Sequence, residues 1–182
     1  MNKSLNGVLI QWLPLVVVIT AMCGLVYLTM QQDLRIGAND PQIQIAEDTA
    51  TALNNGTPIS FTQKINVDQS LAPFTIIYDN QGNVVQSSAT LDGQTPQIPQ
   101  GALNDHKGTS LSENRLTWQP KPNVRLATVI VPFNKGHVLV GRNMREIEIR
   151  VDKLFFQVLL AWIATLLASF FATVVIRVVL KK

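Results

Sequence analysis

Residues 124–154, VRLATVIVPFNKGHVLVGRNMREIEIRVDKL, decide the fold because three kinds of pattern follow one another in them. The stretch 124–133 is rich in β-branched residues and predicts a long strand. Residues 134–136, Asn-Lys-Gly, are typical of a tight turn, and 137–140 predict a returning strand. A β-hairpin is therefore expected near the end of a folded domain.

After Gly141 the spacing of the apolar residues becomes helical. Ile147, Val151 and Leu154 follow one another at intervals of four and three, and neither Pro nor Gly occurs from 142 to 182. This pattern predicts one continuous helix that leaves the sheet and enters a long apolar run.

Two uncharged, mainly apolar runs, residues 8–30 and 154–176, lie near the two ends of the chain. At about 1.5 Å per residue each run reaches roughly 34 Å, enough to cross a hydrocarbon core of about 30 Å. Both are predicted to be transmembrane helices, which excludes a freely soluble protein. An uncleaved anchor is favoured over a cleaved signal peptide or lipoprotein signal, because the first run continues past Cys23 to Met30.

The positive charge predicts the orientation of these helices. The formal net charge is +3. Four basic residues lie at the ends (Lys3, Arg177, Lys181 and Lys182), whereas residues 31–153 hold 11 basic and 12 acidic residues, or −1. Basic flanks stay in the cytoplasm, so both termini are expected there. No folded basic surface is implied, and no nucleic-acid partner is expected.

The expected domains follow directly. They are a cytoplasmic N-terminus (1–7), a first span (8–30), an extracytoplasmic domain (31–153), a second span (154–176) and a cytoplasmic basic tail (177–182).

The central domain is expected to be α+β. A helix is predicted from Asp40, as the capping residue, to about Leu53, and 74–78 with 83–88 predict a second hairpin around a turn. Residues 91–108 are rich in turn formers, with room for a short helix at 99–104. With the strand at 115–118, the result is an antiparallel sheet of about five strands with helices against one face.

The hairpin FTIIYDNQGNVVQSS (74–88), the stretch TPQIPQGAL (95–103) and the closing segment 124–154 resemble the extracytoplasmic PAS-like or Cache-like sensor region of bacterial two-span receptors, such as sensor histidine kinases and chemoreceptors. The resemblance implies a PAS-like domain in the bacterial inner membrane, with a ligand pocket between the sheet and residues 91–108. ANDPQIQIAED, SLAPF and TWQP are also similar to a small uncharacterised family of bacterial membrane proteins. In contrast to the receptors, the protein is expected to have no output domain after the second span, so signalling would require a partner.

Candidate ligand-binding residues follow from this resemblance. Tyr78 and Trp118 offer large contacts with a polar group, and Arg125 can hold a carboxylate through two hydrogen bonds. The alternative is that Trp118 is part of the core and Arg125 is solvated on its strand. No hydrolase, zinc-protease or nucleotide-binding motif occurs, His137 is expected at the surface, and no enzyme activity, cofactor or metal is predicted.

Small residues recur four apart along the second span and allow close packing of helices in lipid. They are Ala161, Ala164, Thr165, Ala168, Ser169 and Ala172. They are expected to contact either the first span or another membrane protein, namely a kinase, a transporter or a second copy of the chain.

Two functions remain open. The first is a membrane-anchored sensor-like or regulatory subunit that binds a small molecule or an envelope partner. The second is a structural or accessory protein that uses the outer domain only for docking.

Overall fold

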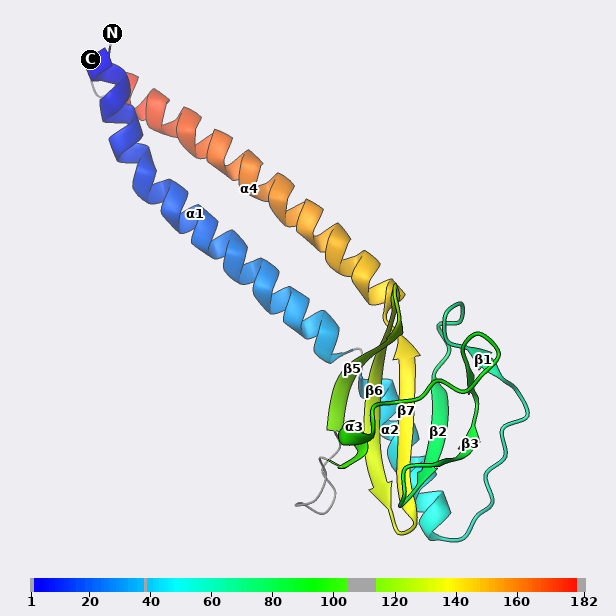
Figure 1. Ribbon diagram of the computed structural model, residues 1–182. Helices are drawn as coiled ribbons and strands as arrows, with labels where there is room; N and C mark the ends of the chain where they lie inside the picture. The colour runs from blue at the N-terminus through cyan, green and yellow to red at the C-terminus, as the bar shows by residue number, and fades with distance from the viewer. Residues whose placement is uncertain (1, 38, 105–113, 180–182) are drawn as a thin grey trace. The chain divides into compact units, whose positions relative to one another are not determined.

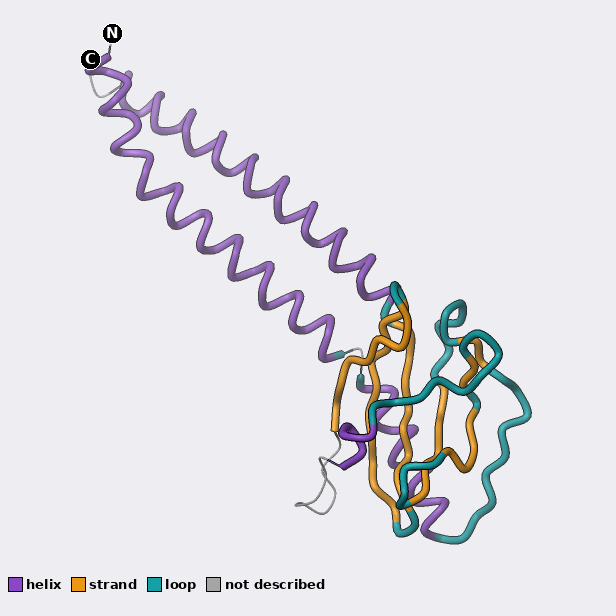
Figure 2. Tube along the Cα trace, in the orientation of Figure 1, coloured by secondary structure: helices purple, strands orange, loops and turns teal. Residues whose placement is uncertain are grey.

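The structure is a computed structural model that describes residues 2–37, 39–104 and 114–179. The chain forms two compact units, traced in Figures 1 and 2. Arg35–Glu148 form one unit, which we call the α+β domain, and the chain on either side of it forms the other, which we call the helical unit.

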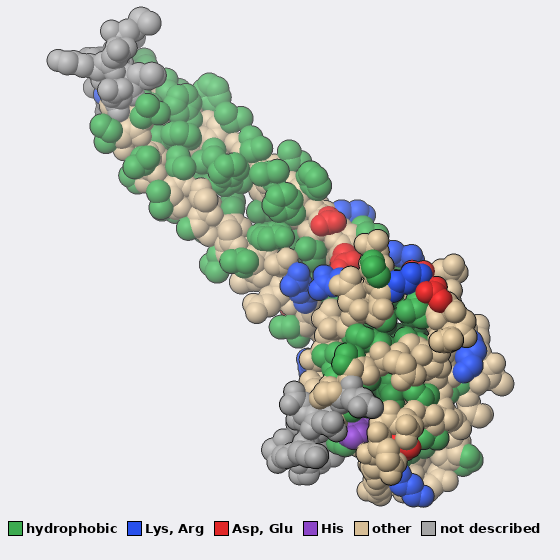
Figure 3. Space-filling view, viewed as in Figure 1, with side chains coloured by type: hydrophobic (Ala, Val, Ile, Leu, Met, Phe, Trp, Pro, Cys, Tyr) green, Lys and Arg blue, Asp and Glu red, His purple; other side chains and the backbone are tan. Residues whose placement is uncertain are grey.

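Two helices make up the helical unit. Helix α1 covers Asn2–Ile36, and α4 covers Arg145–Val179, with its first turn inside the α+β domain. Both are long and apolar enough to cross a membrane, and hydrophobic side chains cover their surface (Figure 3). The Trp12 indole nitrogen donates to the Ser169 hydroxyl at 2.9 Å, and that of Trp162 donates to the Thr20 hydroxyl at 3.0 Å. These two bonds join α1 to α4.

Five antiparallel strands form the main sheet, which confirms the α+β class and the predicted sheet. They are β2 (Phe74–Asp79), β3 (Val84–Ser87), β5 (Asn114–Lys121), β6 (Val124–Phe133) and β7 (Gly136–Asn143). Their order is β3-β2-β7-β6-β5, so β3 and β5 are the edges (Figure 1). Beside them, β1 (Ile65–Asn66) and β4 (Ala89–Thr90) form a short parallel pair.

Helix α2, Asp40–Asn54, packs on one face of this sheet. Ala46 and Ala50 lie against Val129 of β6 and against Val138 and Val140 of β7. The sequence predicts Asp40 as the capping residue, but Asp40 is the first residue of the helix, which therefore begins one residue earlier than expected. Asn39 is the N-cap, without a side-chain capping bond, while Asp40 and Pro41 lie in the first turn.

The opposite face is covered by chain segments from elsewhere in the domain. Val67, Ile98, and Leu103 of the short helix α3 (Gln100–Asn104) join a core with residues from β2, β5, β6 and β7. The expectation of helices against one face is therefore wrong. In β2 the five residues from Phe74 to Tyr78 are all buried, because the central strands are covered on both faces.

The junction between sheet and last helix also differs from the sequence prediction. Strand β7 continues past Gly141, because Asn143 still pairs with Leu126 of β6, and α4 begins at Arg145. The strand therefore brings Arg142 and Asn143 to the end of the sheet, immediately before the helix.

Candidate functional site

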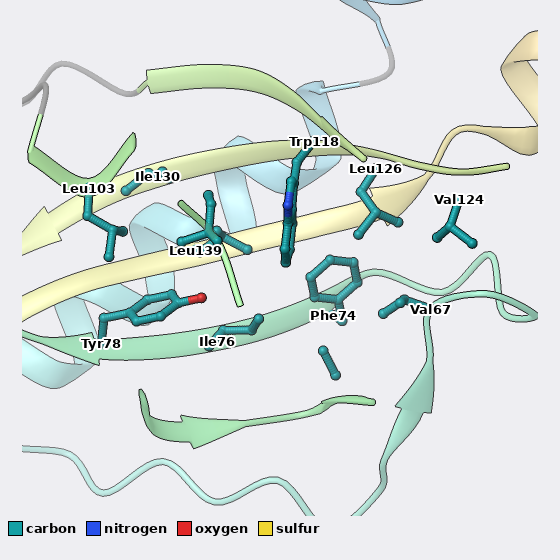
Figure 4. Packing of buried hydrophobic residues seen from close by; sticks show 12 residues of the cluster. Val67, Phe74, Ile76, Tyr78, Leu103, Trp118, Val124, Leu126, Ile130 and Leu139 are labelled. Carbon is teal, nitrogen blue, oxygen red and sulfur yellow. The ribbon is translucent and has the colours of Figure 1, made fainter. Parts of the chain in front are cut away.

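Tyr78 lies in the core of the α+β domain. It is 1% exposed and points into the cluster that holds Leu103, Ile130 and Leu139 (Figure 4). Its buried hydroxyl makes no hydrogen bond of ordinary geometry with the residues that the structure describes. Burial raises the pKa of the phenol to about 12, and the nearby backbone amide of Ile98 offsets part of that rise.

Trp118 lies on the same face of the sheet as Tyr78. Its indole reaches from β5 toward Phe74, beside Leu126, and only 7% of the residue is exposed (Figure 4). The space between the sheet and its crossing segment is thus filled here by the side chains of Trp118, Ile98 and Leu103.

Arg125 lies on the opposite face from Tyr78 and Trp118. Neighbours on a strand point to opposite faces, and both Val124 and Leu126 belong to the cluster that contains Trp118. The Arg125 guanidinium instead bonds the Glu148 carboxylate in the first turn of α4, at 3.1 Å. The three predicted ligand residues therefore do not meet in one site, and a binding role for each stays a prediction.

A groove of about 470 Å³ runs along the outer edge of β3. Residues of β3 and residues of the loop that precedes β1 line it. Figure 2 shows the course of this loop in teal. Its lining consists of Ser60, Phe61, Lys64, Val84, Val85, Gln86, Ser87 and Thr95. Lys64 is the one charged residue in this set, and its ammonium group donates to the Ser87 carbonyl oxygen. The sequence prediction missed this groove, because the loop carries no periodic pattern.

A second feature is a set of hydrogen bonds between a loop, residues 67–72, and the start of α4. The Asn143 amide nitrogen donates to the Val67 carbonyl at 2.7 Å in a buried bond. The Arg142 guanidinium donates to the Leu71 carbonyl at 3.0 Å, and that of Arg145 to the Gln69 carbonyl at 3.2 Å. Three hydrogen bonds to backbone carbonyls therefore join this loop to the β7–α4 junction, which we call the α4 root (142–145).

Asn143 also organises the first turn of α4. Its side-chain oxygen accepts a hydrogen bond from the backbone amide of Arg145 at 2.8 Å. Amides at the start of a helix have no partner inside the helix, so such an acceptor stabilises the helix end. The sequence prediction did not single out Asn143. An Asn just before a periodic run is a local signal that could have identified its role at the helix start, but its bond to Val67 joins positions 76 apart and has no local signal.

One of the small residues of α4 is hydrogen-bonded to α1. Ser169 accepts the bond from Trp12 of α1. The other five, Ala161, Ala164, Thr165, Ala168 and Ala172, are exposed. Within the helical unit, Ser169 is thus the member of this set that has a contact with α1.

Metal-binding side chains do not cluster in the part of the chain that the structure describes. His137 lies in β7, next to the β6–β7 turn, and is half-buried. His106, the other histidine of the sequence, lies outside the described residues.

No family model, curated protein or solved structure matches this chain.

Proposed function

We propose that the chain is a two-span protein of the bacterial cytoplasmic membrane, with α1 and α4 in the bilayer, both termini in the cytoplasm and the α+β domain outside. The exposed apolar surface of the two helices supports this arrangement, since lipid is the medium that such a surface requires. The basic residues at the chain ends support the orientation.

A PAS-like character for the α+β domain is part of the proposal. It is supported by the antiparallel five-stranded sheet and by the segment that crosses one face of the sheet between β3 and β5 and carries α3. The helix on the other face adds the second layer that such a module needs.

The proposed role is that of a non-enzymatic, sensor-like regulatory subunit that acts through a partner membrane protein. The observation that carries it is the fastening of the 67–72 loop to the α4 root. Displacement of this loop would break or shift the hydrogen bonds that hold the start of α4. Helix α4 continues without interruption to Val179. A shift of the α4 root can therefore be transmitted along the helix to its apolar segment.

The recognised molecule is proposed to be an envelope protein rather than a small ligand. The place where a pocket was expected, under the crossing segment, is filled by Tyr78, Trp118 and Leu103. The open groove lies instead at the edge of the sheet, where a protein segment has access. The exposed small residues of α4 support a helix of the partner as a second contact.

The same observations leave docking without signalling as the second candidate function. A filled sheet face favours docking, and the contacts at the α4 root favour regulation. The two functions differ in whether binding at the domain changes α4.

The topology can be tested with single cysteines. In a Cys23→Ser background, Asn55→Cys should react with a membrane-impermeant maleimide in intact spheroplasts, and the protein should resist extraction by alkaline carbonate. Labelling of Asn55→Cys only after lysis would contradict the proposed orientation, and release by carbonate would contradict the spans.

The role can be tested by co-purification of the full chain from gently solubilised membranes. We expect a partner that is retained with wild-type protein and lost with Asn143→Ala, which loosens the α4 root. Recovery of the chain alone in several mild detergents would contradict a subunit role. Equal retention by both proteins would favour docking without signalling.

A further inference from the structure

The two edges of the main sheet are protected to different degrees. Edge strands expose unpaired backbone groups, and proteins protect them with proline, charge and bulges. β5 carries Pro120 and the charged residues Arg115 and Lys121. A register shift occurs at both edges, between Trp118 and Lys121 in β5 and opposite Ile77 and Tyr78 in β3, so bulges do not distinguish them. β3 reads Val-Val-Gln-Ser and carries neither proline nor charge. The edge beside the groove therefore lacks the proline and the charged residues that protect β5.

The register of β2 and β3 shows which backbone groups face the groove. The Ser88 amide donates to the Thr75 carbonyl at 2.9 Å and the Asp79 amide donates to the Asn83 carbonyl at 2.9 Å, so the Ser88 amide and the Asn83 carbonyl point inward, toward β2. The Ser88 carbonyl instead accepts from the Ile65 amide of β1. Backbone groups alternate between inward and outward in an antiparallel pair. Val84 and Ser87, which are the neighbours of those inward residues, therefore direct their N–H and C=O groups outward.

Lys64 satisfies one of these outward groups. Its ammonium group bonds the Ser87 carbonyl, which confirms that this carbonyl faces the groove. The side chain comes from an exposed loop position, and so it can move away without any change in the core. An incoming backbone N–H can replace it at Ser87, after which the exposed ammonium group is available to pair with a carboxylate.

We propose that this groove binds an extended, acidic segment of a partner protein, which adds to the edge of β3 as a sixth strand and places a carboxylate against Lys64. This inference rests on the proposed function, because it names the kind of partner segment that the domain recognises. Charge complementarity selects an acidic occupant, since Lys64 is the one charge among the lining residues that the structure describes. The half-buried Phe61 and the exposed Val85 offer apolar contacts to its side chains.

The test uses the full chain in detergent and a phage-displayed library of random 12-residue peptides. Selection on wild-type protein should enrich peptides that combine β-branched residues with Asp or Glu. Selection on Lys64→Glu should enrich Lys or Arg instead, and wild-type-selected peptides should bind that variant at least tenfold more weakly. Lys135→Glu, an equal charge change in the exposed β6–β7 turn, is the matched control and should keep the acidic preference.

Amide hydrogen exchange supplies the structural readout. A bound peptide should slow the exchange of Val84 and Ser87 at least tenfold and leave the amide of Gly136 unchanged. Val84→Pro removes one outward N–H and should abolish binding if its melting curve shows a folded domain; if it does not fold, the exchange data decide.

Several results would overturn the proposal. They are a selection that yields no binding peptide, peptides that lack acidic residues, affinity that is unaffected by Lys64→Glu, and protection that omits Val84 and Ser87. Self-association through this edge, with no peptide binding, would overturn it in favour of a second copy. None of these results affects the co-purification experiment. The proposed binding groove can therefore be refuted while the proposed regulatory role still stands, and the two failures can be told apart.

Discussion

Replacement of Asn143 by Ala should loosen the α4 root and measurably destabilise the α+β domain. The side chain is 5% exposed and makes two short hydrogen bonds, a donated one to Val67 and an accepted one from Arg145. Alanine leaves the Val67 carbonyl without its donor, which costs about 1–3 kcal/mol. It also removes an acceptor at a helix start, which costs roughly 1 kcal/mol.

Together these losses amount to about 3 kcal/mol. A domain of this size shifts its melting temperature by about 4 °C for each kcal/mol, so the expected fall is about 12 °C. The assay is thermal unfolding of the full chain in detergent, followed by the emission of the buried Trp118. A background with Trp12→Phe and Trp162→Phe removes the two indoles of the helical unit.

Asn143→Asp is the matched variant because it separates the two bonds. The introduced carboxylate still accepts from Arg145 but faces the Val67 carbonyl oxygen, so at pH 7 the variant should be less stable than wild type. When protonated, the carboxyl can donate to that carbonyl. Its pKa is therefore raised in the folded state, and the stability it adds is present at low pH and lost as the pH rises. The reasoning is refuted if Asn143→Ala costs less than about 0.5 kcal/mol, or if the deficit of Asn143→Asp does not shrink on acidification.

Three further predictions concern the core and the ion pair. Gly141→Ala places a Cβ 2.4 Å from the Phe74 ring, so it should cost about 1–3 kcal/mol in urea unfolding, and Phe74→Leu in the same chain should recover part of the loss; strictly additive costs would contradict the clash. Tyr78→Phe should change stability by less than about 1 kcal/mol at pH 7. Because the folded Tyr78 pKa is raised from 10 to about 12, wild-type stability should be lost as the pH rises through that range, and a melting series should show a smaller loss in the variant. Arg125→Ala should cost about 0.2–1 kcal/mol, since the pair with Glu148 is partly exposed, and the cost should diminish in 1 M salt.

The strands and their hairpins were predictable from the sequence because the signals for them are local. The 124–133 prediction matches β6 residue for residue, and the turns at 79–83 and 134–136 carry the Asp, Asn and Gly residues that such turns require. The Asp79 carboxylate accepts bonds from the Asn83 side-chain amide and from the backbone amides of Asn83 and Gln81, and these bonds lower the pKa of its carboxyl.

The covering of both sheet faces was not predictable in the same way. Val67 and Ile98 lie in segments without periodicity, and their burial depends on strands that are distant in sequence. The same holds for the groove, where Lys64 meets Ser87 across 23 positions. Residue type alone made Tyr78, Trp118 and Arg125 plausible ligand residues, but the alternation of β6 puts Arg125 on the other face.

The groove and the α4 root are connected by four consecutive residues, 64–67, and this connection distinguishes regulation from docking. Lys64 bonds the edge of β3, Ile65 donates to Ser88 at 2.7 Å, and the Val67 carbonyl accepts from Asn143. A strand that displaces Lys64 acts on Asn143 only if β1 moves with it. Exchange of the Ile65 amide decides this, because faster exchange on peptide binding means that β1 has opened toward the α4 root. Unchanged exchange means that the edge binds its partner without altering α4, and the protein is then a docking subunit.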